Sequence, residues 1–208
     1  MPHVSAAERR PQLIRAAITL MTREGVAAGS TRAIAAELGV AQATVHYTFG
    51  TKEDLYREVM EQLTEDLVAR VERAAPQDAG FEGTIAALAG ALWRTVEEEG
   101  SGYRLLTELA MLALRTPGLG EARTAHYRQV NEVTERILSE TAARTGFTLA
   151  QPADLVARFF LAGFEGLTMQ RLYVPDEPVN GSDLRALVAA TVALASGGLD
   201  LTAVPTTG

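Results

Sequence analysis

The chain has 208 residues, 47% of them hydrophobic, so it can bury a sizeable core and intrinsic disorder is not its default state. It contains no cysteine, which excludes disulfides, a thiolate nucleophile and a thiolate metal site. No segment approaches the roughly 18 apolar residues of a membrane span, and residues 1–12 are polar and arginine-bearing rather than signal-like. We therefore expect a cytoplasmic protein with no membrane partner.

The formal net charge of −7 is unevenly distributed. Residues 1–50 carry five arginines against three glutamates, a net charge of +2, and the remaining residues carry −9. At physiological salt the Debye length is about 8 Å, so acids on a distant body hardly affect a basic N-terminal part. The overall acidity therefore does not prevent that part from binding a polyanion, although it predicts weak non-specific binding.

Three helices are predicted within the N-terminal 50 residues. The first spans residues 6–23, where apolar side chains recur at helical spacing, and Gly25 ends it. The second is capped by Ser30 or Thr31 and ends at Gly39, a residue type suited to the left-handed conformation. Its predicted inward residues are Ile34, Ala35 and Leu38.

A third helix is predicted over residues 42–48, directly after the turn at Gly39, which makes a helix-turn-helix. Val45 and Phe49 face inward, and the outer face carries small, amide, hydroxyl and aromatic side chains. Glutamine pairs bidentately with adenine, and threonine contacts base edges or phosphates. The expected outer residues are Gln42, Ala43, Thr44, His46, Tyr47 and Thr48.

The rest of the chain predicts six more helices and no strand. Thr51 caps a long helix that reaches residue 74, with Glu53 and Asp54 in its first turn, where the helix dipole favours acids. The following helices are expected over residues 81–99, 103–115, 121–145, 153–173 and 182–196. The last ten residues, 199–208, lack periodicity and are expected to fray.

The last two predicted helices carry more apolar surface than one neighbouring helix usually covers. We expect them to pair with the same helices of a second copy in a four-helix bundle with two-fold symmetry. The alternative is that they are simply core of a monomer. The expected interface residues are Leu155, Phe159, Phe160, Gly163, Leu167, Leu184, Leu187, Val188, Thr191 and Val192.

Residues 81–145 contain both aromatic side chains and side chains that end in a polar group. This mixture suits a mostly apolar small-molecule pocket with a few polar groups that orient the ligand. The alternative is ordinary core, because aromatic and methionine residues at helical spacing usually pack inside. The pocket candidates in this region are Trp93, Tyr103, Thr107, Met111, His126, Tyr127 and Asn131.

The main alternative to a helix-turn-helix binding protein is an enzyme, but the sequence motifs typical of enzymes are missing. The chain has no G-x-S-x-G, G-x-G-x-x-G, Walker or H-E-x-x-H motif, and its three histidines are far apart in sequence. We therefore expect no catalytic site, no metal and no cofactor. A helical module that binds protein is a further alternative, but the outer face from Gln42 to Lys52 lacks large apolar anchors.

Over residues 10–60 the chain resembles the tetracycline-repressor (TetR) family of bacterial transcription regulators. The matching residues are Thr31, Ile34, Ala35, Leu38, Gly39, Val40, Val45, Phe49, Thr51, Lys52, Glu53 and Leu55. His46, Thr48 and Gly50 depart from the family pattern, which affects the operator sequence and not the family assignment.

The resemblance implies roles for individual residues. Base edges would be faced by Arg32, Gln42, Ala43 and Thr44, and phosphates would be held by Thr31, Tyr47 and Lys52; His46 and Thr48 would do either. The alternatives are that Thr31 is only a cap and that Tyr47 only covers the joint between the helices.

The resemblance also implies an all-α dimer with about nine helices per subunit, whose small-molecule pocket includes Phe159 and Phe164. The expected parts are a helix-turn-helix domain over residues 1–50, a connecting helix over 51–75 and a larger ligand-binding and dimerisation domain over 76–198. We expect a repressor that binds a palindromic operator and is released by an inducer, with a transcription activator that is not released by a ligand as the alternative. The inducer is not identified by the sequence.

Overall fold

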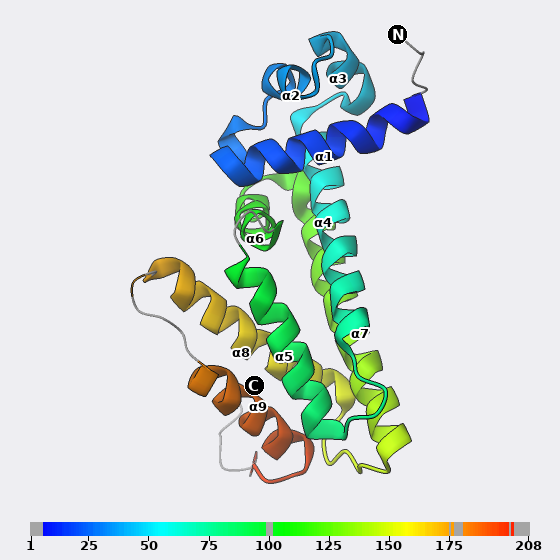
Figure 1. The fold of residues 1–208 in the computed structure, drawn as a ribbon, viewed down its shortest axis with the longest axis vertical. Coiled ribbons are helices and arrows are strands. Elements are labelled where there is room, and N and C mark those ends of the chain that lie inside the picture. The colour runs from blue at the N-terminus through cyan, green and yellow to red at the C-terminus, as the bar shows by residue number, and fades with distance from the viewer. Residues whose placement is uncertain (1–5, 99–101, 175, 177–180, 200, 202–208) are drawn as a thin grey trace. The chain divides into compact units, whose positions relative to one another are not determined.

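The computed structural model describes residues 6–98, 102–174, 176, 181–199 and 201, and within them the chain is helical with no strand (Figure 1). The predicted fold class is confirmed. The α-helices are α1 (Ala6–Glu24), α2 (Thr31–Leu38), α3 (Gln42–Phe49), α4 (Lys52–Ala74), α5 (Phe81–Glu97), α6 (Gly102–Ala113), α7 (Gly120–Thr145), α8 (Ala153–Tyr173) and α9 (Gly181–Ala195). Two short 3-10 helices, η1 (Val26–Ala28) and η2 (Pro117–Leu119), precede α2 and α7. Of the tail expected to fray, residues 200 and 202–208 lie outside the described residues.

The chain divides into two compact units, each made of two stretches. Unit 1 consists of Met1–Val68 and Thr95–Gln129, and unit 2 of Ala69–Arg94 and Val130–Gly208. The unit boundaries fall inside α4, α5 and α7 rather than at residues 50 and 75, where the sequence suggested domain limits. The functional domain limits stay a prediction.

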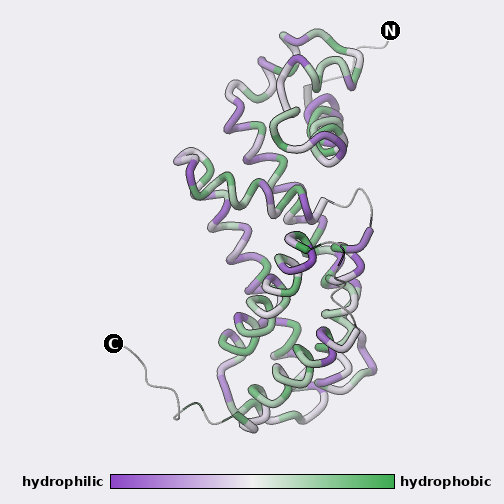
Figure 2. The backbone as a smooth tube through the Cα atoms, turned by 90° about the vertical axis from the view of Figure 1, so that its left-hand side faces the viewer, coloured by the Kyte–Doolittle hydropathy of each residue, from purple (hydrophilic) through white to green (hydrophobic). Residues whose placement is uncertain are grey.

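Unit 1 holds the helix-turn-helix against α1. Apolar side chains of the three N-terminal helices are completely or almost completely buried together, with Leu13, Ile34 and Val45 at 0% exposure. Figure 2 shows hydrophobic and hydrophilic positions alternating along the helical coils, as expected for helices with one buried face. The buried face of each short helix thus fixes how its polar face is presented.

Gly39 makes the turn between α2 and α3. Its backbone is left-handed, with φ 68° and ψ 35°. The N–H of Gly39 donates to the Ala36 carbonyl at 3.2 Å, and the N–H of Val40 donates to the Ala35 carbonyl at 2.9 Å. Carbonyls at the end of α2 are thereby satisfied, and α3 begins three residues after Gly39.

Unit 2 contains the paired helices α8 and α9 and an aromatic cluster. At Gly163 the backbone of α8 comes so close to α9 that a Cβ atom there would lie 2.4 Å from Leu187 Cδ1. Trp93 and Phe164 meet edge to face, with 6.2 Å between ring centroids, and Phe81 stacks on Phe147 at 4.1 Å. Among the described helices, none combines the length and apolar character that a bilayer crossing demands.

Candidate nucleic-acid interface

Ser30 caps α2, which leaves the neighbouring Thr31 side chain available. The Ser30 hydroxyl accepts a hydrogen bond from the Ala33 N–H at 3.2 Å. Thr31 is the first residue of the helix and is half-buried. The sequence left the cap open between these two residues, and the geometry assigns it to Ser30.

Most of the outer face of α3 is open to solvent. Gln42, Ala43 and His46 are exposed, and Tyr47 is 88% exposed. Tyr47 therefore does not cover the joint between α2 and α3. Its ring and hydroxyl are accessible from the surface of unit 1.

The two threonines of α3 depart from the expectation of a fully outward face. Thr44 and Thr48 are half-buried, because they flank the buried row formed by Val45 and Phe49. The Thr48 hydroxyl donates to the Thr44 carbonyl at 2.8 Å, so its hydrogen is used inside the helix. Thr48 retains its oxygen lone pairs, which makes it an acceptor toward any ligand in this geometry.

A side-chain hydrogen bond joins the first residues of the two helices. The Gln42 amide nitrogen Nε2 donates to Thr31 Oγ1 at 3.2 Å. The next residue, Arg32, is exposed on the same first turn of α2. Three residues predicted to contact DNA are thus gathered where α2 and α3 both begin.

Lys52 begins α4 directly after α3. Its ammonium lies 5.2 Å from the centroid of the Tyr56 ring, and the residue is exposed. The start of α4 is held by Thr51 and Asp54: the Asp54 N–H donates to Thr51 Oγ1 at 3.1 Å, and the Thr51 N–H donates to Asp54 Oδ2 at 3.3 Å. This capping box fixes the position from which the lysine extends. The same contacts, chiefly the Thr51 hydroxyl bond, lower the pKa of the Asp54 carboxyl.

Two supports of this surface were not predicted. Arg10 of α1 bonds the Glu58 carboxylate of α4 and places its guanidinium 5.7 Å from the centroid of the Phe49 ring in α3. The Tyr56 hydroxyl donates to the Val26 carbonyl at 2.9 Å. These pairs join residues 30 to 48 positions apart. A single sequence carries no signal for such pairs.

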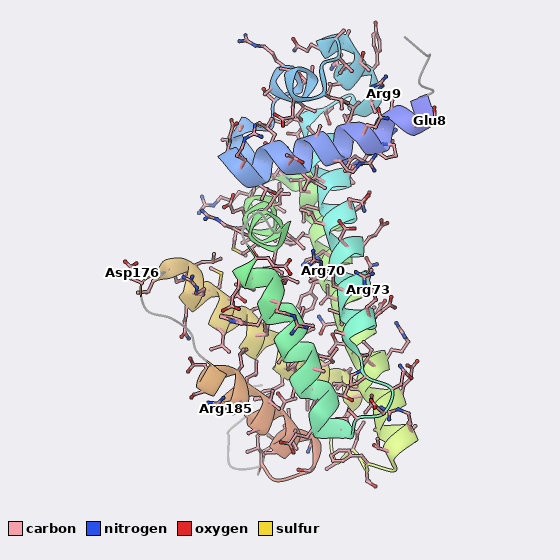
Figure 3. The ribbon with its side chains drawn as sticks, in the orientation of Figure 1. Glu8, Arg9, Arg70, Arg73, Asp176 and Arg185 are labelled. Carbon is pink, nitrogen blue, oxygen red and sulfur yellow. The ribbon has the colours of Figure 1, made fainter. Side chains whose placement is uncertain are left out.

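Internal ion pairs occupy two of the arginines that gave the N-terminal part its positive charge. Arg23 bridges Glu24 at 2.8 Å and Glu37 at 3.0 Å, and Arg10 is engaged by Glu58. The hydrogen bond from Arg23 lowers the pKa of the Glu37 carboxyl, which keeps that pair ionised. Arg9 lies on the second turn of α1 and donates to Gln12 at 3.0 Å (Figure 3).

The residues predicted to line a ligand pocket divide between the two units. Trp93 and Phe164 are buried and touch each other in unit 2, where Asn131 and the partly exposed Phe159 also lie. The unit 1 candidates are Tyr103, Thr107, Met111, His126 and Tyr127, of which Met111 is 52% exposed and Tyr127 is 48% exposed. The pocket stays a prediction.

His126 is the unit 1 candidate with the most specific surroundings. Its Nδ1 lies 2.9 Å from the hydroxyl of buried Thr64, which donates to the Met60 carbonyl at 2.7 Å. The Thr64 hydroxyl thus lies within hydrogen-bonding distance of both the Met60 carbonyl and the His126 ring. Burial lowers the pKa of His126, so the neutral ring is favoured.

The predicted interface residues of α8 and α9 fall into two groups. Phe160, Leu187, Val188 and Thr191 are buried inside unit 2 and contribute to its core. The other six are at least partly accessible: Leu155, Phe159, Gly163, Leu167, Leu184 and Val192. Only this second group is available for contact with another copy, and the dimer itself stays a prediction.

A helix-turn-helix that exposes amide and hydroxyl side chains from its second helix, on an otherwise all-α scaffold, defines a helix-turn-helix DNA-binding protein. Residues 13–59 match the family model described as bacterial regulatory proteins, tetR family. Residues 79–194 match the model described as tetracyclin repressor-like, C-terminal domain. The chain therefore belongs to the TetR family and is a DNA-binding transcription regulator.

Individual relatives agree with this assignment. The nicotine-responsive transcriptional repressor HdnoR of Paenarthrobacter nicotinovorans is 27% identical over 175 residues, which cover 84% of this chain and 89% of that protein. A TetR family member from Streptomyces coelicolor A3 is 31% identical, with a TM-score of 0.67 and coverage of 88% of this chain and 98% of the other. The multidrug binding protein EbrR, complexed with ethidium, is 29% identical with a TM-score of 0.70 and the same coverage. The named relatives are regulators or binding proteins rather than enzymes.

Proposed function

We propose that this chain is a cytoplasmic, dimeric repressor that binds a palindromic operator and leaves it when a small-molecule inducer binds. The observation that carries the proposal is the exposed polar surface formed by the start of α2, α3 and the start of α4, supported by a buried apolar core. Its side chains, Arg32, Gln42, Tyr47 and Lys52 among them, have the chemistry of base and phosphate contacts.

A dimer is part of the proposal because a single copy of this surface contacts too few base pairs to select one operator. One short recognition helix contacts only a few base pairs, and two related by a two-fold axis read half-sites about 34 Å apart or a multiple of that spacing. The accessible apolar residues of α8 and α9, Phe159 above all, support pairing with a second copy through these helices. An isologous interface of this kind predicts a palindromic operator.

The inducer is proposed from relatives and from the aromatic cluster of unit 2. HdnoR is named as nicotine-responsive, and EbrR was captured with ethidium; both small molecules are nitrogen-containing aromatics. The contact between Trp93 and Phe164 supplies aromatic faces and edges of the kind that bind such rings. To change operator occupancy from nearly full to nearly empty, the inducer must prefer the released state by about 10⁴-fold.

An activator is the second candidate. The transcriptional activator FasR of Mycolicibacterium smegmatis is 30% identical over 101 residues, which cover 49% of this chain and 46% of that protein. The match spans about half of either chain, so repression, as in HdnoR, is the better supported direction. A reporter fused to the bound promoter separates the two, because deletion of this protein raises expression under a repressor and lowers it under an activator.

The deciding experiment selects genomic fragments that the purified chain binds and then measures affinity for the selected duplex. Gln42→Ala is expected to relax preference at one base pair by about 1–3 kcal/mol, whereas Lys52→Ala weakens all sequences alike and lowers the salt slope by about 1. No enrichment of any sequence at moderate salt would refute the proposal. Identical behaviour of the two variants would refute the division of roles between them.

A further inference from the structure

The hydrogen bond between Gln42 and Thr31 connects a residue expected to read a base with a residue expected to hold a phosphate. We propose that Thr31 is a positioning residue for Gln42, so that the backbone contact and the base contact are coupled through one side-chain bond. This inference rests on the proposed function and names a determinant of its specificity.

The Thr31 hydroxyl can bond Gln42 because it is not needed to cap α2. Ser30 caps α2, so the Thr31 hydroxyl is not used by the helix N-terminus. Thr31 Oγ1 accepts from Gln42 Nε2 at 3.2 Å. The hydroxyl hydrogen remains to be donated outward, and a phosphate oxygen is the acceptor that DNA offers at this position.

The geometry of the amide group explains why this contact leaves Gln42 competent to read a base. The two hydrogens on Nε2 point in different directions. The one on the carbonyl side forms, together with Oε1, the two-point contact with N7 and N6 of adenine. The other, trans to the carbonyl, is the one that a lateral acceptor such as Thr31 can take without disturbing that contact.

A Thr31 hydroxyl that donates to phosphate can only accept from Gln42. It then bonds the amide nitrogen and not the amide oxygen, so the orientation of the amide about its last torsion is fixed. A glutamine with a fixed donor and acceptor order distinguishes adenine, which offers an acceptor and a donor, from guanine, which offers two acceptors. An untethered and exposed Gln42 would sample both orientations and discriminate less well.

The test uses the full-length chain and the duplex selected by the wild type, with variants of that duplex at the base pair whose preference Gln42→Ala relaxes. Thr31→Val keeps the branched shape and removes the hydroxyl. We expect it to lower the preference at that one base pair by about tenfold, within the range of a lost bidentate contact. Thr31→Ser, which keeps the hydroxyl, is expected to retain the preference.

The double variant Thr31→Val with Gln42→Ala is expected to show the same preference as Gln42→Ala alone, because Thr31 acts through Gln42. Ser30→Ala is the matched control: it removes a hydroxyl one residue away, destabilises α2 and is expected to leave the base preference intact. The inference is overturned if Thr31→Val weakens all duplexes equally with an unchanged ratio, or if the two substitutions reduce the preference additively.

A second measurement, by NMR on the free protein, tests the inference even if Thr31→Val binds no DNA. In the free protein, the two side-chain amide protons of Gln42 are expected to differ in chemical shift more than those of an exposed glutamine, and Thr31→Val should reduce their separation to that of an exposed glutamine. An unchanged amide pair would contradict the hydrogen bond itself. Failure of the wild type to select any duplex would instead contradict the proposed function, so the two failures are distinguishable.

Discussion

Substitution of Gly39 by alanine tests why the turn of the helix-turn-helix has glycine there: because the backbone is left-handed, or because a side chain would not fit. A Cβ atom built at Gly39 meets nothing within 4 Å, so Gly39→Ala introduces no steric clash. Its only cost is the positive φ of 68°. A left-handed alanine costs about 1–2 kcal/mol, and the lower entropy of the unfolded chain returns about 0.4–1 kcal/mol. We expect a net loss of about 1 kcal/mol.

Gly120 is the matched control in the same unit. Its added Cβ also meets nothing within 4 Å, but its backbone is helical, with φ −59° and ψ −40°. Gly120→Ala is therefore expected to stabilise the chain by about 0.4–1 kcal/mol, because alanine restricts the unfolded chain and fits the folded backbone without strain.

The assay is urea unfolding followed by circular dichroism, with thermal melts as a second reading. For a chain of this size, 1 kcal/mol shifts the melting temperature by roughly 2–4 °C, so the two variants should move in opposite directions by a measurable amount. Equal shifts of the same sign would refute the argument. They would mean that the turn tolerates alanine or that the helical glycine has a packing role.

Three further outcomes follow from individual contacts. Tyr56→Phe removes the hydroxyl bonded to the Val26 carbonyl and should cost about 1 kcal/mol of unfolding free energy, which urea titration measures. The pKa of His126 is depressed below its ordinary value of 6.5, so the unfolded chain binds the proton more readily. Its stabilising contribution is present above pH 6.5 and is lost as the pH falls below that value, so His126→Gln should flatten the fall in stability between pH 7 and 5. Phe159→Glu, at a residue 38% exposed, should give a folded monomer by sedimentation at micromolar concentration. Phe160→Ala, at a residue 1% exposed, should instead cost about 3–5 kcal/mol of stability. A Phe159→Glu variant that stayed dimeric would contradict the interface.

Helix positions were predictable because the buried faces repeat at helical spacing. The predicted limits of α8, residues 153–173, agree with the structure at both ends. The helix α6 was predicted to reach residue 115 but ends at Ala113, because the chain must turn ahead of Pro117. The 3-10 helices η1 and η2 escaped prediction, since three residues are too few to establish a period.

For the candidate site, the sequence predicted which side chains of α3 lie on its outer face but not the contacts that they make. Spacing placed Gln42 and Tyr47 outside and Val45 inside, which the structure confirms. It could not show that Thr48 would direct its hydroxyl to the preceding turn, because Thr hydroxyls choose between backbone and solvent by rotamer. Nor could it show the bond between Gln42 and Thr31, which depends on the angle between two helices.

The distribution of arginines bears on how this surface gains affinity. Residues 1–50 carry a net charge of +2, but the guanidinium groups of Arg10 and Arg23 are already bound to carboxylates of the same unit. Recruiting either one to a phosphate would break an internal contact, so counterion release has to come from few side chains, with Arg32 and Lys52 the best placed. A weak electrostatic contribution leaves a larger share of operator binding to hydrogen bonds that require correct orientation. In such a surface the orientation of one amide, set by a neighbouring hydroxyl, has a larger effect on the choice of sequence than it would in a strongly basic one.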